Sequence, residues 1–484
     1  MANVEHNTLS SAAGLRRKAA PLAPVPALYV AFHCDKPLEP PSRHFLGDAD
    51  AVCVGRGVQR SSARVAEGPN RQLLLSVADG WMSSRHAVLR RSGERWILED
   101  AGSRNGTFVN GQQIQRAVLK DGDLLELGHT LLSYREAVPR TSEDTADLDA
   151  ASLQGPTPTF SPALAAEMGR IGTIARSNVS VVIQGETGSG KEVAARAMHV
   201  LSGRPGAFVA VNCGGIARTL VETELFGYRK GAFSGADEDR PGLMRTADKG
   251  TLFLDEIADL PAGAQAAVLR ALQESEVHPV GATRPVKVDV RVLAATHFDL
   301  QQQVAEGEFR ADLLARISGF TVRLPPLRNR REDLGLLIAE MIRRHGGGSA
   351  TVSFSTEAAN ALFHHPWPLN VRELEKCIAT ALVLAGGEPI EPQHLPEWAH
   401  LPGAQVLLSE TPVPNPDEET FPGPRPSTPR VVSVEDQRRR EELIALLREH
   451  RGNISQIARA MGKARMQVQR WLKRFGLDPE TYRG

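Results

Sequence analysis

The chain has 484 residues, with 57 Lys or Arg and 57 Asp or Glu, so its formal net charge is zero. This length predicts two to four domains, and 41% hydrophobic with 24% charged residues excludes a wholly disordered chain, a collagen and a basic arm running end to end. Any affinity for nucleic acid must therefore come from local segregation of charge.

The four cysteines stand far apart and form no C-x-x-C pair, which excludes a disulfide framework and a recognisable zinc site. This usage favours a reducing, cytoplasmic compartment. Basic residues 16–18 precede an apolar run, but three prolines between positions 21 and 26 interrupt it, so we expect no secretory signal. No stretch approaches the roughly 18 to 20 apolar residues that cross a bilayer, so we expect no membrane partner.

Short segments of alternating apolar and polar residues fill positions 27–136, after a flexible N-terminus predicted at 1–26. Gly and Asn separate these segments, a pattern that predicts an all-β sandwich. The expected strands lie around 28–32, 73–77, 87–89, 96–98, 124–127 and 131–134.

Loop motifs interrupt these strands: Gly55-Arg56, Ser83-Ser84-Arg85-His86, Ser103-Arg104-Asn105-Gly106-Thr107 and Asn110-Gly111. Arg56 brings a permanent cation and the serines bring donors, which a phosphothreonine dianion requires. The pattern resembles the forkhead-associated (FHA) domain. The resemblance implies that a phosphopeptide contacts Arg56, Ser83, Ser84, Arg104 and Asn105, while His86 supports the loop. A sandwich used only for packing is the alternative.

No receiver pattern with a phosphorylated aspartate is found, which suggests that the input is the product of a Ser/Thr protein kinase, in signalling independent of two-component systems. The phosphothreonine lies in another protein or in a phosphorylated segment of the same chain. Residues 137–158 are polar and acidic, which predicts a linker with several Ser and Thr residues.

Residues 159–330 alternate short apolar runs with helical patterns, which predicts a parallel sheet with crossover helices. The runs lie at 179–183, 208–211, 252–254 and 290–295. Residues 185–191 read GETGSGK and follow the first run, the context of a phosphate-binding loop. The glycines let backbone N–H groups point at a phosphate, and Lys191 adds a charge. Glu192 stands where a Mg²⁺-binding hydroxyl is usual.

A second nucleotide signal is the strand 250–254, which ends in Asp255 and Glu256. Asp255 can hold Mg²⁺ and Glu256 can orient the attacking water, as in a Walker B segment. A buried strand with a solvated acidic end explains one such motif, but the ordered pair of motifs favours nucleotide hydrolysis with ATP and Mg²⁺ as cofactors.

The segment Gly231-Ala232-Phe233-Ser234-Gly235-Ala236 follows Glu224-Leu225-Phe226-Gly227 and resembles the GAFTGA loop of sigma-54-dependent activators. These activators are AAA+ ATPases known as bacterial enhancer-binding proteins, and the resemblance covers about residues 157–400. It implies that residues 231–236 contact the sigma factor, chiefly through Phe233 and Ser234. In this family a Glu after the P-loop Lys is usual, as with Glu192.

The same resemblance assigns further roles. Asn212 resembles the switch Asn that pairs with Glu256, and Thr296 resembles sensor I, with His297 where Asn is frequent. Arg310 and Arg316 resemble fingers that reach a neighbouring subunit's phosphate, which implies a homo-oligomeric ring, hexameric by resemblance. Surface salt bridges are the alternative for these two arginines.

The segment 367–374 reads WPLNVREL and resembles the helical lid of this family, expected at 331–401, with Arg372 as sensor II. Leu369 replaces the usual Gly. The implied nucleotide contacts are Gly185, Glu186, Thr187, Gly188, Ser189, Gly190, Lys191, Glu192, Thr296 and Arg372.

A proline-rich linker at 402–432 precedes a last domain at 433–484, where seven Lys or Arg and no acid lie between positions 451 and 474. Apolar positions 468, 471, 472 and 475 share one helical face, and Gly462 marks a turn between helices. The all-α helix-turn-helix so predicted resembles the Fis-like DNA-binding domain of this activator family. Its candidate DNA contacts are Arg465, Gln467, Gln469, Arg470, Lys473 and Arg474.

These motifs together predict an ATP-driven activator that binds enhancer DNA, remodels the sigma-54 RNA polymerase holoenzyme and answers to phosphothreonine. One alternative is a phosphopeptide-gated DNA-binding regulator whose ATPase serves only as an assembly switch. Another is a general AAA+ remodeller or helicase loader, against which the loop at 231–236 argues.

Overall fold

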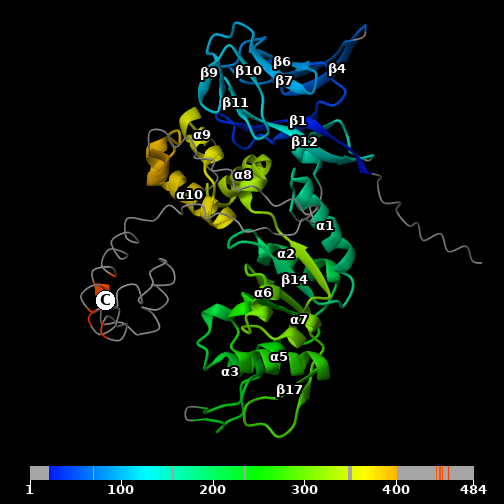
Figure 1. Cartoon of the computed structure of the whole chain (residues 1–484), viewed down its shortest axis with the longest axis vertical. Helices are drawn as coiled ribbons and strands as arrows, with labels where there is room; N and C mark the ends of the chain where they lie inside the picture. Colours follow the sequence, from blue (N-terminus) through cyan, green and yellow to red (C-terminus); the bar gives the residue numbers. More distant parts are fainter. Residues whose placement is uncertain are drawn as a thin grey trace, which may run out of the picture. The chain divides into compact units, whose positions relative to one another are not determined.

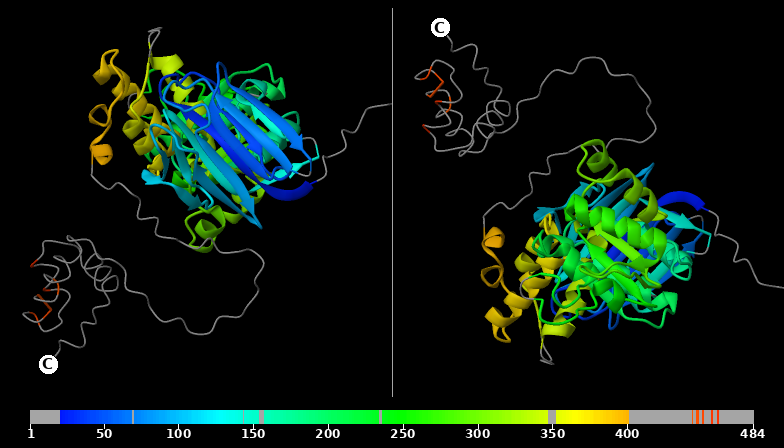
Figure 2. Two further views of the ribbon diagram at one scale, coloured as in Figure 1. Left: turned by 90° about the horizontal axis from the view of Figure 1, so that it is seen from above. Right: turned by 90° about the horizontal axis from the view of Figure 1, so that it is seen from below.

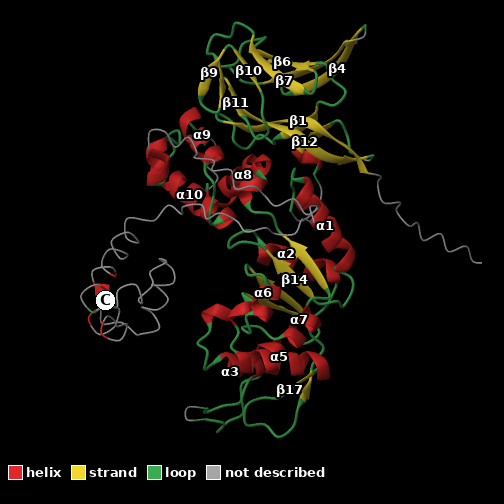
Figure 3. Ribbon diagram, in the orientation of Figure 1, coloured by secondary structure: helices red, strands yellow, loops and turns green. Residues whose placement is uncertain are grey.

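The computed structural model describes residues 21–400, apart from 69, 143, 154–156, 234–235 and 347–351, and then residues 443, 446–447, 450, 456 and 460. The chain divides into two compact units, Met1–Leu407 and Leu408–Gly484. In chain order the first unit holds a β-sandwich, an α/β core and a helical lid (Figures 1 and 3). Among the described residues, no helix is both long enough and apolar enough to pass through a bilayer.

The β-sandwich has a seven-stranded sheet in the order β13-β2-β1-β12-β11-β8-β9 and a six-stranded sheet in the order β10-β7-β6-β3-β5-β4. Its strands run side by side in the left view of Figure 2. Their bounds are β1 (Pro21–His33), β2 (Ser42–Phe45), β3 (Ala51–Arg56), β4 (Ser61–Glu67), β5 (Asn70–Val77), β6 (Ala87–Ser92), β7 (Arg95–Asp100), β8 (Thr107–Val109), β9 (Gln112–Ile114), β10 (Arg116–Val118), β11 (Leu124–Leu127), β12 (Thr130–Thr141) and β13 (Asp147–Asp149). Alternate residues such as Val30, Leu89 and Leu132 fill the space between the sheets.

The edges of the sandwich differ from the sequence prediction. Strand β1 begins at Pro21, inside the segment 1–26 that we expected to be flexible. The expected linker 137–158 contributes the end of β12, all of β13 and a 3-10 helix, η1 (Ala150–Ser152). Strand β13 pairs with β2, and Asp147 bonds His44, so a short acidic segment is held by partners about 100 positions away. Because β13 is held by polar contacts, its sequence shows no apolar periodicity that would predict a strand.

The α/β core contains a parallel sheet in the order β15-β16-β19-β14-β20. Its strands are β14 (Val181–Gln184), β15 (Phe208–Asn212), β16 (Thr251–Asp255), β19 (Arg291–Thr296) and β20 (Phe320–Arg323). Val182 packs in one core cluster while Val181 and Ile183 pack in another, because helices cover both faces of the sheet. This arrangement confirms the predicted fold class.

The helices of this core connect its strands. They are α1 (Pro162–Ile174), α2 (Lys191–Ser202), η2 (Cys213–Gly215), α3 (Val221–Phe226), α4 (Leu243–Thr246), η3 (Ile257–Asp259), α5 (Ala262–Glu274), α6 (Leu300–Ala305), α7 (Ala311–Ile317) and η4 (Leu327–Asn329). A small hairpin of β17 (Glu276–Val277) and β18 (Val286–Lys287) follows α5.

The lid follows the core and consists mainly of α8 (Leu334–His345), α9 (Thr356–His364) and α10 (Asn370–Ala385). Short 3-10 helices flank it: η5 (Arg331–Asp333), η6 (Pro392–His394) and η7 (Glu397–His400). Trp367 is fully buried between these helices, and its Nε1 donates to the Leu362 carbonyl. The helices of the lid therefore pack around Trp367.

The second unit contains few described residues. Leu443 and Leu447 are helical and buried, and the His450 N–H donates to the Leu446 carbonyl. The predicted linker 402–432 and the six candidate DNA contacts lie outside the described residues.

Candidate functional site

The predicted phosphate-binding loop connects β14 to α2. Gly188 and Gly190 have φ values of 75° and 106°, which side chains other than Gly rarely adopt. A Cβ at Gly188 would also lie 2.1 Å from the Leu369 carbonyl oxygen of the lid. Ser189 is buried, and its Oγ has no hydrogen-bond partner among the described residues. A loop of this shape at a helix N-terminus suits a phosphate group.

Lys191 is the first residue of α2 and is 6% exposed. Its Nζ donates to the Gly185 carbonyl at 3.0 Å and lies 3.2 Å from Glu256 Oε1. The structure therefore brings the P-loop and the end of β16 together, as the ordered pair of sequence motifs predicts.

Asp255 and Glu256 end β16 in different environments. Burial raises the pKa of Asp255, although Lys191 opposes this effect. Burial also acts to raise the pKa of Glu256, but the hydrogen bond with His297 and the charge of Lys191 outweigh it, so the net pKa is lowered. Glu256 is thus held as a carboxylate at neutral pH.

His297 follows β19 and contacts Glu256 directly. Its Nδ1 lies 2.7 Å from Glu256 Oε2. Thr296 is fully buried at the end of β19, next to β14, where its carbonyl accepts from Gly185 N–H. Asn212 ends β15, but its Oδ1 accepts from the Gly215 N–H and caps η2. In this structure the side chain of His297, not that of Asn212, contacts Glu256.

The P-loop is braced by Asn370 of the lid and by Arg328 and Arg330 of the segment that leads into it, none of which we expected to contact the loop. Arg328 forms a paired contact with Glu186, at 2.6 and 2.8 Å, and this hydrogen bonding lowers the pKa of Glu186. Asn370 donates to Glu186 and to the Thr187 carbonyl. Arg330 is buried and donates to the Ser189 carbonyl at 3.0 Å. Asn370 belongs to the lid motif 367–374, whereas no sequence signal marks Arg328 and Arg330.

The remaining residues predicted around the nucleotide lie in three places. Arg372 is exposed on α10, with its Cβ 2.9 Å from the position that a Cβ of Gly188 would take. Arg310 directly precedes α7 and pairs with Asp312. Arg316 lies in the last turn of α7 and donates to the Leu272 carbonyl. Glu192 is exposed and pairs with Arg196 on the next helical turn.

The predicted sigma-contact loop is held at its base. The Gly231 N–H donates to the Ala236 carbonyl at 2.8 Å, and Ala236 is buried. Phe233 is 42% exposed and packs edge-on against Tyr228, with ring centroids 4.9 Å apart. Ala232 is half-buried, while Ser234 and Gly235 lie outside the described residues.

The predicted phosphopeptide residues gather on loops at one end of the sandwich. Ser83 joins two of them, because its carbonyl accepts from the Arg56 N–H and its Oγ accepts from the Arg104 N–H. Asn105 donates to the Trp81 carbonyl at 2.7 Å. The side chains of Arg56, Ser84, Arg104 and Asn105 are exposed, so they are available to a ligand.

Buried polar residues hold these loops from behind. His86 is fully buried, accepts from the Ser83 N–H and lies 3.0 Å from the Gly106 carbonyl, in the supporting role expected for it. Asp100 accepts from Ser103 and Thr107, an arrangement that the sequence did not indicate.

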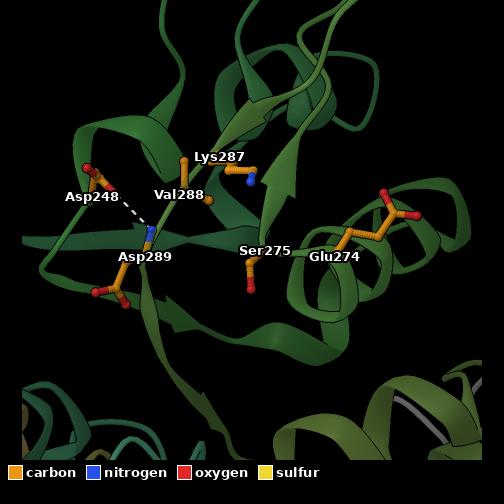
Figure 4. Close-up of a pocket in the computed structure, with 6 residues that line it drawn as sticks. All are labelled: Asp248, Glu274, Ser275, Lys287, Val288 and Asp289. Carbon is orange, nitrogen blue, oxygen red and sulfur yellow. Dashed lines mark hydrogen bonds between the residues drawn. The ribbon is translucent and has the colours of Figure 1, made fainter.

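A separate hollow of about 400 Å³ lies beside the β17–β18 hairpin (Figure 4). It is lined by Asp248, Glu274, Ser275, Lys287, Val288 and Asp289, and the Asp248 carboxylate accepts from the Asp289 N–H. None of the residues predicted for nucleotide, peptide or sigma-factor contact lines it.

Comparison with protein families finds matches along the chain. Residues 159–323 match the sigma-54 interaction domain, 52–128 the FHA domain, 328–404 an AAA+ ATPase lid domain and 434–480 a homeodomain-like domain.

Several transcriptional regulators are similar over much of the chain. The regulatory protein ZraR of Salmonella typhimurium is 38% identical over 74% of this chain and 77% of its own length. The acetoin catabolism regulatory protein of Cupriavidus necator is 38% identical over 80% of this chain, which spans 56% of that protein. Among solved structures, NtrX of Brucella abortus in complex with ATP is 31% identical over 67% of this chain and 70% of its own, with a TM-score of 0.47.

With the P-loop, the acidic pair and the lid in one site, and with regulators alike over most of the chain, the protein belongs to the sigma-54-dependent transcriptional regulators, as a member with an N-terminal FHA domain, an AAA+ domain with lid and a C-terminal helix-turn-helix.

Proposed function

We propose that the protein is an ATP-driven transcriptional activator that binds enhancer DNA and remodels the sigma-54 RNA polymerase holoenzyme under control of phosphothreonine. The observation that carries this proposal is the combination, in one α/β core, of a braced nucleotide site and a half-exposed Phe233 on a glycine-flanked loop. ATP hydrolysis in the nucleotide site would move the Phe233 loop against the sigma factor.

The nucleotide site has groups suited to phosphoryl transfer. The P-loop backbone and Lys191 would stabilise the phosphate charge, and Asp255 would hold Mg²⁺, which neutralises phosphate oxygens when bound. Glu256 is ionised and held by two neighbours, so it is suited to orient a water molecule. Thr296 and Arg372 lie at the edges of the same loop and would contact the nucleotide.

Arg310 and Arg316 are exposed on the surface of α7, so we propose that they act on a neighbouring subunit's nucleotide. An arginine supplied from a second subunit stabilises the charge of the transition state. A homo-oligomeric ring, hexameric by family resemblance, follows from this assignment. Asn212 would report the state of the γ-phosphate to the loop at 231–236.

The regulatory and DNA-binding parts complete the proposal. The exposed Arg56, Ser84, Arg104 and Asn105, together with Ser83, would bind a phosphothreonine made by a Ser/Thr kinase, in a partner or in this chain. The helix-turn-helix would bind enhancer DNA through its six candidate contacts, Arg465, Gln467, Gln469, Arg470, Lys473 and Arg474.

Open-complex formation by purified sigma-54 holoenzyme, measured together with ATP hydrolysis, tests this function. The full chain should hydrolyse ATP and open the promoter, while Phe233→Ala should hydrolyse ATP and leave the promoter closed. Val383→Ala is the control, because Val383 is also an exposed apolar residue, at 80%, but lies on the lid. Hydrolysis by the unaltered chain without an open complex would refute the proposal and favour a DNA-binding regulator whose ATPase only controls assembly.

A further inference from the structure

One face of the seven-stranded FHA sheet turns apolar side chains away from the core of the sandwich. Val30, Leu125 and Leu132 pack between the two sheets, as expected for alternate strand residues. Phe32 and Leu131, on the same strands, are buried instead in the hydrophobic cluster of the lid. Ala31, Cys34 and Leu124 belong to this second cluster as well.

A break in strand register explains how Phe32 reaches the lid. Val30 pairs with Leu132 and Phe32 pairs with Leu131, so Ala31 is an extra residue on β1. A bulge of this kind reverses the alternation of side chains beyond it. Ala31 and Phe32 therefore lie in the same cluster although they are neighbours in sequence.

The contact between FHA sheet and lid is dense. Phe32 packs edge-on against Phe354, with ring centroids 5.2 Å apart, and at 5.8 Å from Phe363 of α9. Aromatic pairs at this spacing add to the free energy gained from burial. The Cys34 carbonyl also accepts from the Phe354 N–H at 2.9 Å, so the two backbones are joined directly.

Polar contacts border this apolar centre. Asn360 of α9 donates to the Glu126 carboxylate of β11. The Arg135 Nη1 of β12 donates to Oε2 of the buried Glu332 of η5 at 3.3 Å. A Cβ added at Gly335 of α8 would lie 2.0 Å from the Ala31 carbonyl oxygen, which leaves room only for Gly. Strand β1 lies beside α8 in Figure 1.

The same elements connect onward to both candidate sites. On the FHA side, the His129 carbonyl accepts from the Cys34 N–H, and the His129 ring stacks on Trp81, whose carbonyl accepts from Asn105. On the ATPase side, Asn370 and Arg330 of the lid segment contact the P-loop.

We infer that this face of the FHA sheet is a binding surface for the lid of the same chain, so that the FHA domain and the lid move as one body while the ATPase turns over. A free FHA domain would expose Phe32, Leu124 and Leu131 together, an apolar patch of the kind that marks an interface. The loops that we propose to bind the phosphopeptide are therefore fixed to the lid of the ATPase. They do not belong to a domain that moves separately from it.

Cross-linking of the full chain tests this inference. Glu126→Cys and Asn360→Cys place one thiol on each side of the contact, and a short bis-maleimide joins them. A specific protease site at residues 154–156, between the FHA and AAA+ domains, then reports the bond, because a cross-linked chain keeps its full mass on a denaturing gel. The unsubstituted chain and each single variant control for the native cysteines. Arg116→Cys with Asn360→Cys is the matched control pair, since Arg116 lies on the other sheet.

We expect the Glu126 and Asn360 pair to cross-link, the Arg116 pair to stay open, and the cross-linked, uncleaved protein to hydrolyse ATP within about threefold of its rate before treatment. Failure to cross-link would overturn the inference. A larger loss of turnover would overturn it too, because it would mean that the lid must leave the FHA sheet in each cycle.

A second variant tests whether the cross-link depends on the apolar contact around Phe32. Phe32→Asp in the same cysteine pair would bury an unpaired charge at the lid but leaves the sandwich core unaltered, because Phe32 does not belong to it. We expect cross-linking to fall by about tenfold. Equal yield would overturn the inference. Neither measurement uses sigma-54, DNA or phosphopeptide, so failure here is distinct from failure of the proposed function.

Discussion

The nucleotide site and the phosphopeptide loops both lie where strands end, but the protein holds them in different ways. In the nucleotide site Lys191 is buried, and Glu256 is held by Lys191 and His297. In the FHA domain the side chains that we propose to meet the phosphopeptide, such as Arg56 and Arg104, are exposed, and the buried support lies behind them in His86. Chemistry on a phosphate requires fixed, desolvated charges, whereas reversible recognition can use exposed ones.

This contrast predicts that single substitutions have larger effects in the nucleotide site. Lys191→Ala should lower the turnover of ATP by on the order of 10²-fold or more, because it removes a buried charge next to the phosphate-binding loop. Steady-state hydrolysis measures this, and binding to enhancer DNA should persist. Arg196→Ala, on the exposed side of the same helix, is the control. Turnover close to that of the unaltered chain would place the catalytic charge elsewhere.

The scaffold of the FHA domain offers a test that depends on pH. Burial acts to raise the pKa of Asp147, but hydrogen bonds with His44 and Arg64 outweigh it and lower the pKa to about 2. A carboxylate with a lowered pKa stabilises the folded state above its ordinary pKa, and this stabilisation is lost as the pH falls toward 2. Asp147→Asn should therefore cost about 2 kcal/mol at neutral pH.

Urea unfolding of both proteins at several pH values measures the Asp147 effect. The difference between them should shrink below about pH 4, where Asp147 begins to be protonated in the unfolded chain. A difference that stays constant down to pH 3 would show that Asp147 does not hold β13 through its charge.

Arg56→Ala sharpens the comparison from the FHA side. We expect the dissociation constant for a phosphothreonine peptide library to rise by about tenfold, the loss of one charged hydrogen bond in an exposed site. Fluorescence anisotropy measures it, with the unphosphorylated library as the blank. Arg90→Ala is a matched control, since Arg90 is an exposed arginine on β6 that pairs with Glu99. Unchanged affinity would remove Arg56 from the site.

The smallest effect is expected at the rim of the nucleotide site. Arg328 pairs with Glu186 of the P-loop, but both side chains are about 40% exposed, at 42% and 41%. Solvent weakens such pairs, so Arg328→Ala should weaken ATP binding by only about two- to threefold. Titration with a fluorescent ATP analogue measures this, with Arg343→Ala on α8 as control. A tenfold loss would mean that the rim is as critical as the buried centre.

Much of the fold could be predicted because its signals are local. Runs of buried apolar residues such as 181–183 belong to a strand covered on both faces, and a glycine-rich loop before a helix has one common use. The strand β13 escaped prediction because its stability comes from His44 and Arg64, far away in sequence. The extension of β1 to Pro21 escaped prediction because it pairs with β12, where Pro21 lies opposite Thr141, far away in sequence.

The candidate sites show the same division. Lys191 and Glu256 were predicted to cooperate, because each stands at a recognisable position at the end of a strand or loop. The bond from His297 to Glu256 and the brace from Arg328 to Glu186 were not, because no spacing in the sequence encodes them.

The amino-acid sequence by itself determined the order of the domains and the groups that meet a phosphate, since periodicity and loop composition act over a few neighbouring residues. Only the tertiary structure decided which faces those domains share. The extra residue at Ala31 turns Phe32 from the sandwich toward the lid, and the gain comes from burial against Phe354, more than 300 positions away.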